Sequence, residues 1–284
     1  MIIPAFPQDW AILEHELLNE TFSSFIWKVR LLNDEIAIVK EIKIFDDDED
    51  ELRGFHYLKW HNGGACVRLL DFQGRRMLLE YAGDKTLKQV ITEQSDNDAT
   101  DIAAEVIKDL LAQSDKMADK PIPAQLQPLR DRFKSLFNKA DQERIDNAES
   151  FYIKAGAIAE RLLDNQRNLR VLHGDIHHEN IMLGKRGWLV IDPKGLYGDM
   201  VFDTANMFYN PLHQIDLTAD PSRIGKMAEC FATALNQSPR HILDYAVSYG
   251  ALSASWHAED GSIEDEENAL QVAAAIMHSR NHFF

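Results

Sequence analysis

The sequence predicts an α+β protein with two lobes that share a cleft. We expect a small amino-terminal lobe with an antiparallel β-sheet over residues 1–82 and a larger, mainly helical lobe over residues 83–284. The chain has 284 residues, and single hydrophobic cores stop growing at roughly 250 to 300 residues. In addition, β-branched and aromatic residues are concentrated before Gly83, whereas helical spacing of apolar residues dominates after it.

The amino-terminal lobe is predicted from three strand-like runs and one helix. Turn signals at Asn33-Asp34 and residues 71–74 separate the strand-like runs TFSSFIWKVRLL, EIAIVKEIKIF and GRRMLLEYA. Between the second and third runs, residues 51–60 place Leu52, Phe55 and Leu58 on one face at helical spacing. The acidic run 46–51 before this helix is interpreted as a solvated loop.

Helical patterns fill the second lobe, with one exception. We expect helices over residues 101–117, 125–138, 142–165, 221–235, 240–255 and 264–279. The exception is the segment HGDIHHENIMLGKRGWLVIDP, in which two short apolar runs flank a turn at Lys185-Arg186-Gly187. This pattern predicts a β-hairpin inside the helical lobe.

Composition excludes several classes of partner. Forty-six acidic residues against 30 basic ones give a net charge of -16 and a pI near 5.1, so neither nucleic acid nor an anionic membrane is an expected partner. No apolar run approaches the roughly 20 residues that span a bilayer. The first residues do not resemble a secretory signal, and Cys66 and Cys230 lack disulfide or zinc spacing. We therefore expect a cytoplasmic protein with reduced cysteines; its oligomeric state is not predicted.

The predicted hairpin carries the chemistry. Because Asn180 and Asp192 are about equally far from the turn, pairing of the two strands brings them together, with Asp175 in the loop just before. Phosphoryl transfer from ATP needs a carboxylate that orients the acceptor hydroxyl and takes its proton, and hard oxygen ligands for Mg2+. Asp175 fits the first role, and Asn180 and Asp192 fit the second. HxDxxxxN followed by a strand ending in Asp matches the catalytic and metal loops of the kinase fold, with His173 as its first residue.

A lysine for the nucleotide phosphates is predicted in the second strand. Lys40 ends Ala-Ile-Val-Lys, similar to the V-A-I-K pattern of kinases, and Lys43, three residues on, should face the opposite side. The helix that follows should supply a carboxylate to pair with Lys40. Glu51 is the preferred partner because it begins that helix, and Glu49 is the alternative.

The remaining nucleotide contacts are assigned by position. Ser23 and Ser24 lie in a turn before the lysine strand, where hydroxyl and backbone N–H groups could reach phosphate oxygens, although an ordinary serine-rich turn is an alternative. The turn has no glycine, unlike G-x-G-x-x-G. Backbone groups of Glu80 and Ala82, at the end of the strand module, are predicted to receive the adenine.

Three segments together resemble the aminoglycoside/hydroxyurea resistance kinases, the group containing streptomycin 6-phosphotransferases, within the aminoglycoside phosphotransferase superfamily. They are HGDIHHENIM, GWLVIDPKGLYGDMVFD and LSASWHAEDG. The resemblance implies a protein-kinase-like two-lobe fold, Mg-ATP as donor and a small hydroxylated acceptor. It implies that Asp175 is the catalytic base, that Asn180 and Asp192 bind magnesium and that Lys40 binds phosphate, while Asp203 ties the catalytic loop in place. Gly-poor nucleotide loops are found in this family.

Candidate acceptor contacts come from acidic and aromatic residues. Glu259 and Asp260, in an expected loop between the last two helices, could attract a cationic sugar, and Trp256 could form a ring platform. Asp199 is a further candidate, although a helix N-cap is the simpler role for it.

Two other functions stay open from the sequence. His173, Asp175, His177 and His178 could form the metal cluster of a hydrolase, although His177 and His178 are also interpretable as a surface or supporting pair. A nucleotide-binding pseudokinase that acts as an interaction module is the other alternative.

Overall fold

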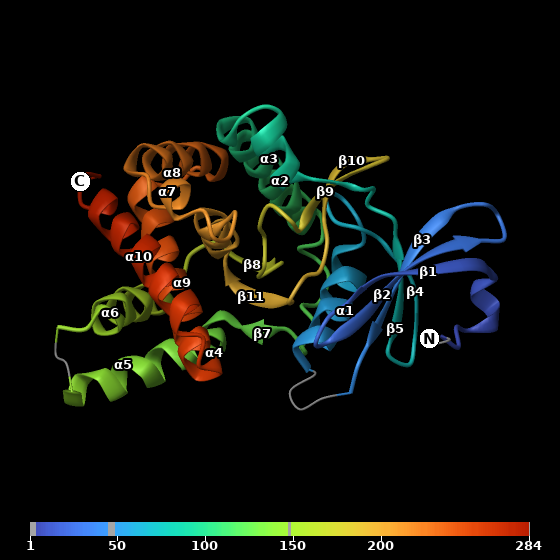
Figure 1. Ribbon diagram of the computed structural model, residues 1–284, viewed down its shortest axis with the longest axis horizontal. Coiled ribbons are helices and arrows are strands. Elements are labelled where there is room, and N and C mark those ends of the chain that lie inside the picture. The colour runs from blue at the N-terminus through green and yellow to red at the C-terminus, as the bar shows by residue number, and fades with distance from the viewer. Residues whose placement is uncertain (1–3, 45–48, 147–148, 284) are drawn as a thin grey trace.

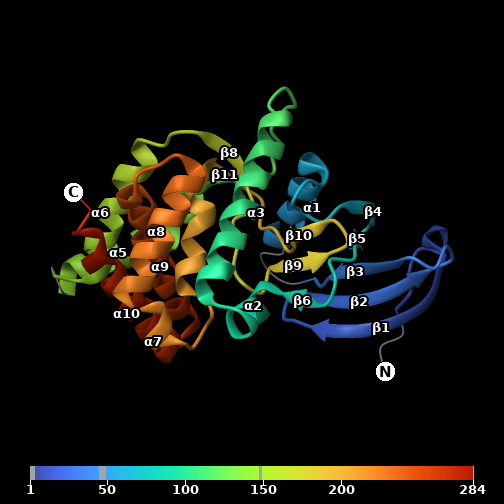
Figure 2. The ribbon, with the colours of Figure 1, turned by 90° about the horizontal axis from the view of Figure 1, so that it is seen from above.

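The computed structural model of the protein describes residues 4–44, 49–146 and 149–283. Residues 46–48 of the acidic run, interpreted above as a loop, lie outside the described residues. The β-sheet and the helical bundle lie at opposite ends of the molecule, with α1 (Glu49–His61), β9 (Ile181–Gly184) and β10 (Gly187–Val190) between them (Figures 1 and 2). The predicted α+β class with an amino-terminal antiparallel sheet and a mainly helical remainder is confirmed.

The amino-terminal sheet has five antiparallel strands in the order β1-β2-β3-β5-β4. A short 3-10 helix, η1 (Gln8–Trp10), precedes them, and the strands are β1 (Ile12–Glu20), β2 (Ser24–Leu31), β3 (Ile36–Ile42), β4 (Leu69–Gln73) and β5 (Arg76–Glu80). The sequence interpretation missed β1 and β4. After Ile12 every residue of β1 is exposed, so this edge strand lacks the apolar alternation that identifies a half-buried strand.

Helix α1 is held against the loop that carries Asp192. Gly54 interrupts the helical pattern in the sequence, and the fold explains why: a Cβ atom there would lie 2.4 Å from the Pro193 carbonyl oxygen. On the neighbouring face the Phe55 ring stacks on Phe72 of the sheet at 4.0 Å between centroids. Glycine therefore permits the close approach that brings Glu51 to the cleft.

Two small sheets connect the lobes. The first has the order β10-β9-β6 and contains the hairpin with β6 (Lys85–Thr86); the second, β7-β11-β8, consists of β7 (Gln127–Pro128), β11 (Leu196–Asp199) and β8 (Leu169–Leu172). The helical elements around them are α2 (Leu87–Glu93), α3 (Asp96–Lys116), α4 (Leu129–Arg132), α5 (Lys134–Asp146), α6 (Phe151–Asp164), the 3-10 helix η2 (Met200–Tyr209), α7 (Ile215–Thr218), α8 (Pro221–Leu235), α9 (Pro239–Asp260) and α10 (Ile263–Arg280).

Several predicted helix boundaries were wrong. Residues 125–138, expected as one helix, contain β7, α4 and the start of α5. The single helix expected over residues 142–165 is two helices, because Ser150 begins α6 by accepting a hydrogen bond from the Tyr152 N–H. The last helix expected before Gly261 does not end at residue 255. Helix α9 runs to Asp260, so Glu259 and Asp260 form its last turn and not a loop, and Gly261 ends it with a φ of +73°.

The core is continuous through the helical lobe and reaches the site. Its largest fully buried side chains include Phe208, Phe231, Tyr245 and Ile181 of the hairpin. A separate, smaller cluster formed by Trp10, Trp27, Val29, Ala37, Val39 and Leu78 lies within the amino-terminal sheet lobe. None of the helices that the structure describes is both long and apolar enough to cross a membrane.

Candidate active site

The β9–β10 hairpin brings Asn180 and Asp192 together. Val190 pairs with Ile181, and the Ile191 N–H donates to the Asn180 carbonyl at 2.9 Å. Asp192 follows with a φ of +59°, a left-handed conformation that residues other than glycine rarely adopt. The backbone bond from Lys194 N–H to the His173 carbonyl, at 2.8 Å, holds the segment on the other side of Asp192. Strained backbone fixed from both sides in this way is characteristic of functional sites.

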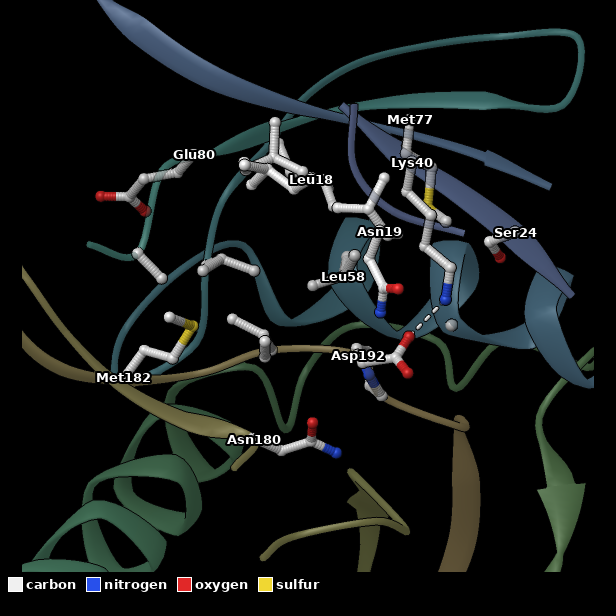
Figure 3. Close-up of a pocket in the computed structure, with 18 of the residues that line it drawn as sticks. Leu18, Asn19, Ser24, Lys40, Leu58, Met77, Glu80, Asn180, Met182 and Asp192 are labelled. Carbon is white, nitrogen blue, oxygen red and sulfur yellow. Dashed lines mark hydrogen bonds and ion pairs between the residues drawn. The ribbon is translucent and has the colours of Figure 1, made fainter. Parts of the chain in front are cut away.

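Four charged side chains meet beside this hairpin. The Lys40 ammonium lies in hydrogen-bonding contact with both Glu51 and Asp192, as Figure 3 shows for Asp192. Lys194 completes the group, 3.3 Å from Asp192 Oδ2 and 3.4 Å from Glu51 Oε1. The predicted pairing of Lys40 with the start of α1 thus involves Glu51. The alternative, Glu49, is exposed and pairs with Arg53 at 3.2 Å.

Mutual attraction keeps this group charged although it is largely buried. Burial raises the pKa of Asp192, but the positive charges of Lys40 and Lys194 outweigh that effect and hold this pKa well below its usual range. The same balance lowers the pKa of Glu51. For Lys194, burial lowers the pKa, and the Asp192 and Glu51 carboxylates more than reverse the effect.

Asp175 is held by two amides. Asn206 donates to its Oδ1 at 3.0 Å, and Asn180 donates to its Oδ2 at 3.3 Å and to its backbone carbonyl at 2.9 Å. The nitrogen of Asn180 is thereby committed to Asp175, and Figure 3 shows its amide oxygen turned towards Asp192. Asn206 is in turn oriented by Asn210, whose Nδ2 donates to Asn206 Oδ1 at 3.0 Å. Sequence reasoning missed Asn206, Asn210 and Lys194, since none belongs to the short motif.

Asp203 and His173 anchor the catalytic loop from beneath. The Asp203 carboxylate accepts hydrogen bonds from the N–H groups of His173 at 2.9 Å and Gly174 at 2.7 Å. Burial raises the pKa of Asp203 to about 7, against the effect of these donors. Burial also lowers the pKa of His173 to about 3. Its Nε2 faces the Ile191 carbonyl at 2.9 Å, so the ring joins the loop to the strand that leads to Asp192.

A cavity of about 480 Å3 opens between the sheet and the hairpin. Its walls are largely apolar, and its labelled lining in Figure 3 runs from Met77 and Leu58 to Met182. The lining residues come from both sides of the cleft and include Ser23, Ser24, Lys40, Glu51, Glu80, Ala82, Asn180, Asp192 and Lys194. The structure thus brings all of the sequence-predicted nucleotide and metal residues to one cavity.

Two of these lining residues have identifiable local partners. The Ser23 hydroxyl donates to Glu51 Oε1 at 3.0 Å, which joins the serine turn to the charged group. The Glu80 carboxylate pairs with Arg186 of the hairpin turn at 2.6 Å, so only its backbone is available to the cavity. Lys43 does not line the cavity; its ammonium contacts Glu20 at 2.9 Å and the Thr21 carbonyl at 2.6 Å.

A second cavity, of about 320 Å3, is lined by Asp175, which does not line the first. Asp175, Asn206 and Tyr209 line it from the catalytic loop and η2, and the helices α9 and α10 contribute His257 and Asp265. Its other lining residues are mostly neutral; in the described part of the chain the lining contains no lysine or arginine. Asp175 and Asp265 are its carboxylates, and three histidines also line it.

The predicted acceptor residues do not line this second cavity. Glu259, Asp260 and Trp256 lie around a different hollow, where the Arg132 guanidinium sits 4.5 Å from the Trp256 ring centroid. Residues 256, 259 and 260 follow i, i+3 and i+4 spacing and together line this hollow, whereas Ser253 and His257 of the same helix line the second cavity. Asp199 is 1 % exposed and caps η2 by accepting from the Val201 N–H at 3.1 Å. Its side chain is thus used inside the fold, as the simpler interpretation held.

The histidines of the motif are engaged separately. His173 is bonded to backbone groups, and His178 is fully buried, whereas His177 lines the second cavity. Within residues 4–44, 49–146 and 149–283, no three side chains of His, Cys, Asp or Glu are grouped so that they could hold a metal ion. Cys66 and Cys230 are both free thiols.

The fold and this site define a kinase-like phosphotransferase of small molecules. Residues 9–261 match the aminoglycoside/hydroxyurea antibiotic resistance kinase family, and the chain belongs to that family. It is 31% identical over 280 residues to a streptomycin 3''-kinase of Klebsiella pneumoniae, covering 95% of this chain and 98% of the relative. A streptomycin 6-kinase of Streptomyces griseus is 26% identical, covering 77% of this chain and 71% of the relative.

The fold is also found in solved structures. One similar structure is a thermostable mutant of an aminoglycoside phosphotransferase in a ternary complex with AMP-PNP and hygromycin B, with a TM-score of 0.64 at 14% identity. The match covers 94% of each chain. The predicted kinase-like fold and the predicted family are thus confirmed.

Proposed function

We propose that this protein transfers the γ-phosphoryl group of ATP, with Mg2+, to a hydroxyl of a small cationic molecule such as an aminoglycoside of the streptomycin type. The observation that carries the proposal is that Asp175 lines one cavity and is hydrogen-bonded to Asn180, which lines the other. The cavity with Asn180 holds Lys40 and Asp192 and has apolar walls, and the cavity with Asp175 has no lysine or arginine in its described lining. We infer that residues 1–82 form the nucleotide lobe and that residues 83–284 carry the catalytic loop and the acceptor site.

The nucleotide fits the first cavity by its chemistry. The apolar walls suit an adenine ring, with backbone groups of Glu80 and Ala82 as its hydrogen-bonding partners. Lys40 supplies the cation for the phosphates, and Glu51 keeps the Lys40 ammonium pointed into the cleft. Ser23 and Ser24 offer neutral donors at the glycine-free turn. Because ATP is supplied in the cytoplasm, we propose that the protein acts there.

The donors near the phosphates suit magnesium. Asp192 offers a carboxylate, and Asn180 offers an amide oxygen. The amide nitrogen of Asn180 is bonded to Asp175, so its amide oxygen faces the cavity. Hard oxygen ligands of this kind, few in number and completed by phosphate and water, are what Mg2+ prefers. When bound, the ion would neutralise charge on the phosphates. Asn180 and Asp192 would hold it.

Asp175 performs the proton chemistry in this proposal. Its carboxylate orients the acceptor hydroxyl toward the γ-phosphorus and accepts the proton as the new P–O bond forms. Two amides hold its oxygens, so the reacting oxygen of the acceptor meets a carboxylate with one orientation. Orientation and electrostatics supply most of the rate in this class of reaction.

The acceptor occupies the second cavity. Asp265 and Asp175 are its carboxylates, and with no lysine or arginine in the described lining they would favour an ammonium or guanidinium group. We propose Asp265, at the start of α10, as the contact for the cationic part of the acceptor, in place of the earlier candidates Glu259, Asp260, Trp256 and Asp199.

A kinase assay tests the proposal. The purified protein with ATP and MgCl2 is incubated with streptomycin, other aminoglycosides and hydroxyurea, and ADP release and phosphorylated product are measured. We expect turnover with at least one cationic acceptor. Asp192→Ala should lose magnesium-dependent nucleotide binding. Nucleotide binding without turnover on any acceptor would favour the pseudokinase alternative, and failure to bind nucleotide would refute both.

A further inference from the structure

Lys194 lies at the junction of the catalytic loop, the Asp192 strand and α1. Its backbone N–H donates to the His173 carbonyl at 2.8 Å, and the next residue, Gly195, bonds to the same carbonyl at 3.3 Å. A Cβ on Gly195 would lie 2.6 Å from the Arg53 carbonyl oxygen, so α1 presses on this segment from the other side. The backbone that carries the Lys194 side chain is therefore fixed between the two lobes.

The side chain of Lys194 mirrors that of Lys40. Lys40 contacts Asp192 Oδ1 and Glu51 Oε2, whereas Lys194 contacts the other oxygen of each carboxylate, Asp192 Oδ2 and Glu51 Oε1. Two lysines and two carboxylates therefore form a closed, neutral group. The Lys194 side chain is 19% exposed and opens on the nucleotide cavity. An ammonium in this position can exchange its carboxylate partners for the phosphate oxygens of a bound nucleotide without moving into bulk solvent.

Lys40 and Lys194 are the basic residues of the described cavity lining. The turn with Ser23 and Ser24 supplies only neutral donors, and Lys40 lies on the sheet side of the cleft, where the earlier phosphates of the nucleotide would bind. Lys194 lies on the opposite side, bonded through its backbone to the loop that holds Asp175, and its charge interacts with that carboxylate. In the proposed function, Lys40 would thus meet the earlier phosphates, and Lys194 the phosphoryl group nearest Asp175.

We propose that Lys194 is a second catalytic cation, which binds the oxygens of the phosphoryl group during its transfer; the inference rests on the proposed function. The acceptor oxygen forms a bond to the γ-phosphorus while the bond from that phosphorus to the bridging oxygen of ADP breaks. The electron pair of the broken bond stays on ADP, and the acceptor proton passes to Asp175. Lys194 neutralises charge on the non-bridging oxygens in between, as an arginine does in some related reactions.

Binding measurements separate this role from a merely structural one. If Lys194 acts on the transferring group, Lys194→Met should retain affinity for Mg·AMP-PNP within about threefold. It should lose about 10²- to 10³-fold in affinity for Mg·ADP with aluminium fluoride, which mimics the transferring group. Lys40→Met is the matched control, and we expect it to weaken both complexes. Lys194→Arg keeps the charge and should recover much of the aluminium fluoride complex.

Turnover provides the second readout. With streptomycin as acceptor, Lys194→Met should lower kcat by about 10²- to 10³-fold with little change in the KM for ATP. The inference is overturned if Lys194→Met weakens AMP-PNP and the aluminium fluoride complex equally, or if it leaves both complexes and kcat unchanged. In either case the proposed function still holds if the wild-type protein binds Mg·AMP-PNP and phosphorylates an acceptor. Wild-type protein that binds no nucleotide would instead refute the proposed function itself.

Discussion

The two cavities are built in different ways. In the proposed nucleotide cavity, Lys40, Glu51 and Asp192 come from one strand, the start of one helix and the end of one hairpin, and each follows a recognisable short pattern. The proposed acceptor cavity takes two or more residues each from the catalytic loop, η2, α7, α9 and α10. Chemistry common to a class of reactions is thus encoded locally, whereas the surface proposed to meet the acceptor is assembled from residues far apart in the chain.

Substituting the proposed base should have the most different effects at the two cavities, because it should lower turnover without weakening nucleotide binding. Asp175→Asn keeps the size of the side chain but cannot accept the acceptor proton, so kcat should fall by about 10²- to 10⁴-fold. Nucleotide affinity should stay close to that of the wild type, because Asp175 does not line the nucleotide cavity. Titration with AMP-PNP and steady-state kinetics check both points. Unchanged acceptor-dependent turnover would show that Asp175 is not the base.

Asn206 offers a finer test of how Asp175 is held. Asn206→Ala removes the 3.0 Å bond to Asp175 Oδ1, and we expect a loss of about 10- to 100-fold in kcat with an unchanged KM for ATP. The control is the same substitution in Asp175→Asn protein. If Asn206 acts through the base, it should add little further loss there. Equal losses in both backgrounds would indicate a general effect on folding.

The acceptor cavity can be tested with a matched pair of acidic residues. Asp265 lines this cavity. Glu259 lies outside it and accepts a hydrogen bond from the Ser135 hydroxyl. Asp265→Asn should raise the KM for streptomycin by about 5- to 10-fold, the effect of losing one charge-assisted contact. Glu259→Gln should leave it unchanged. The reverse result would restore the sequence-based assignment of the acceptor site.

The loop between the cavities should also make stability depend on pH. Burial lowers the pKa of His178 to about 3, and neither ring nitrogen has a hydrogen-bond partner among the described residues. The unfolded chain takes up a proton at this position below pH about 6.5, whereas the folded protein does not. Keeping His178 neutral therefore costs nothing above pH 6.5, and the free energy of unfolding decreases as the pH falls from there towards 3.

A comparison of two proteins measures this effect. Between pH 7 and pH 5, His178 should cost wild-type protein about 2 kcal/mol of unfolding free energy. His178→Leu removes the titrating group, so its urea midpoint should fall less over the same interval. Parallel midpoints for the two proteins would exclude His178 as a source of the pH dependence.

Prediction from the sequence succeeded where neighbours in space are neighbours in the chain or are joined by a regular hairpin. The pairing of Asn180 with Asp192 follows from their equal distance to the turn. The placement of Lys40 opposite them followed from a strand pattern. The strand β1 was missed because its residues are exposed and carry no apolar alternation. Helix α9 was predicted to end too early, because only its packing shows that residues 256–260 continue it.

The sequence by itself determined the class of fold, the family and the hairpin that brings Asn180 and Asp192 together, because short-range periodicity and fixed motif spacing specify strands, a hairpin and its polar ends. Only the tertiary structure decided that Lys194 shares its carboxylates with Lys40, that Asn206 holds Asp175, and that Asp265, and not Glu259, lines the cavity beside Asp175. Those contacts join residues from separate helices and loops, and they depend on the angles at which the helices pack, which no local pattern of residues encodes.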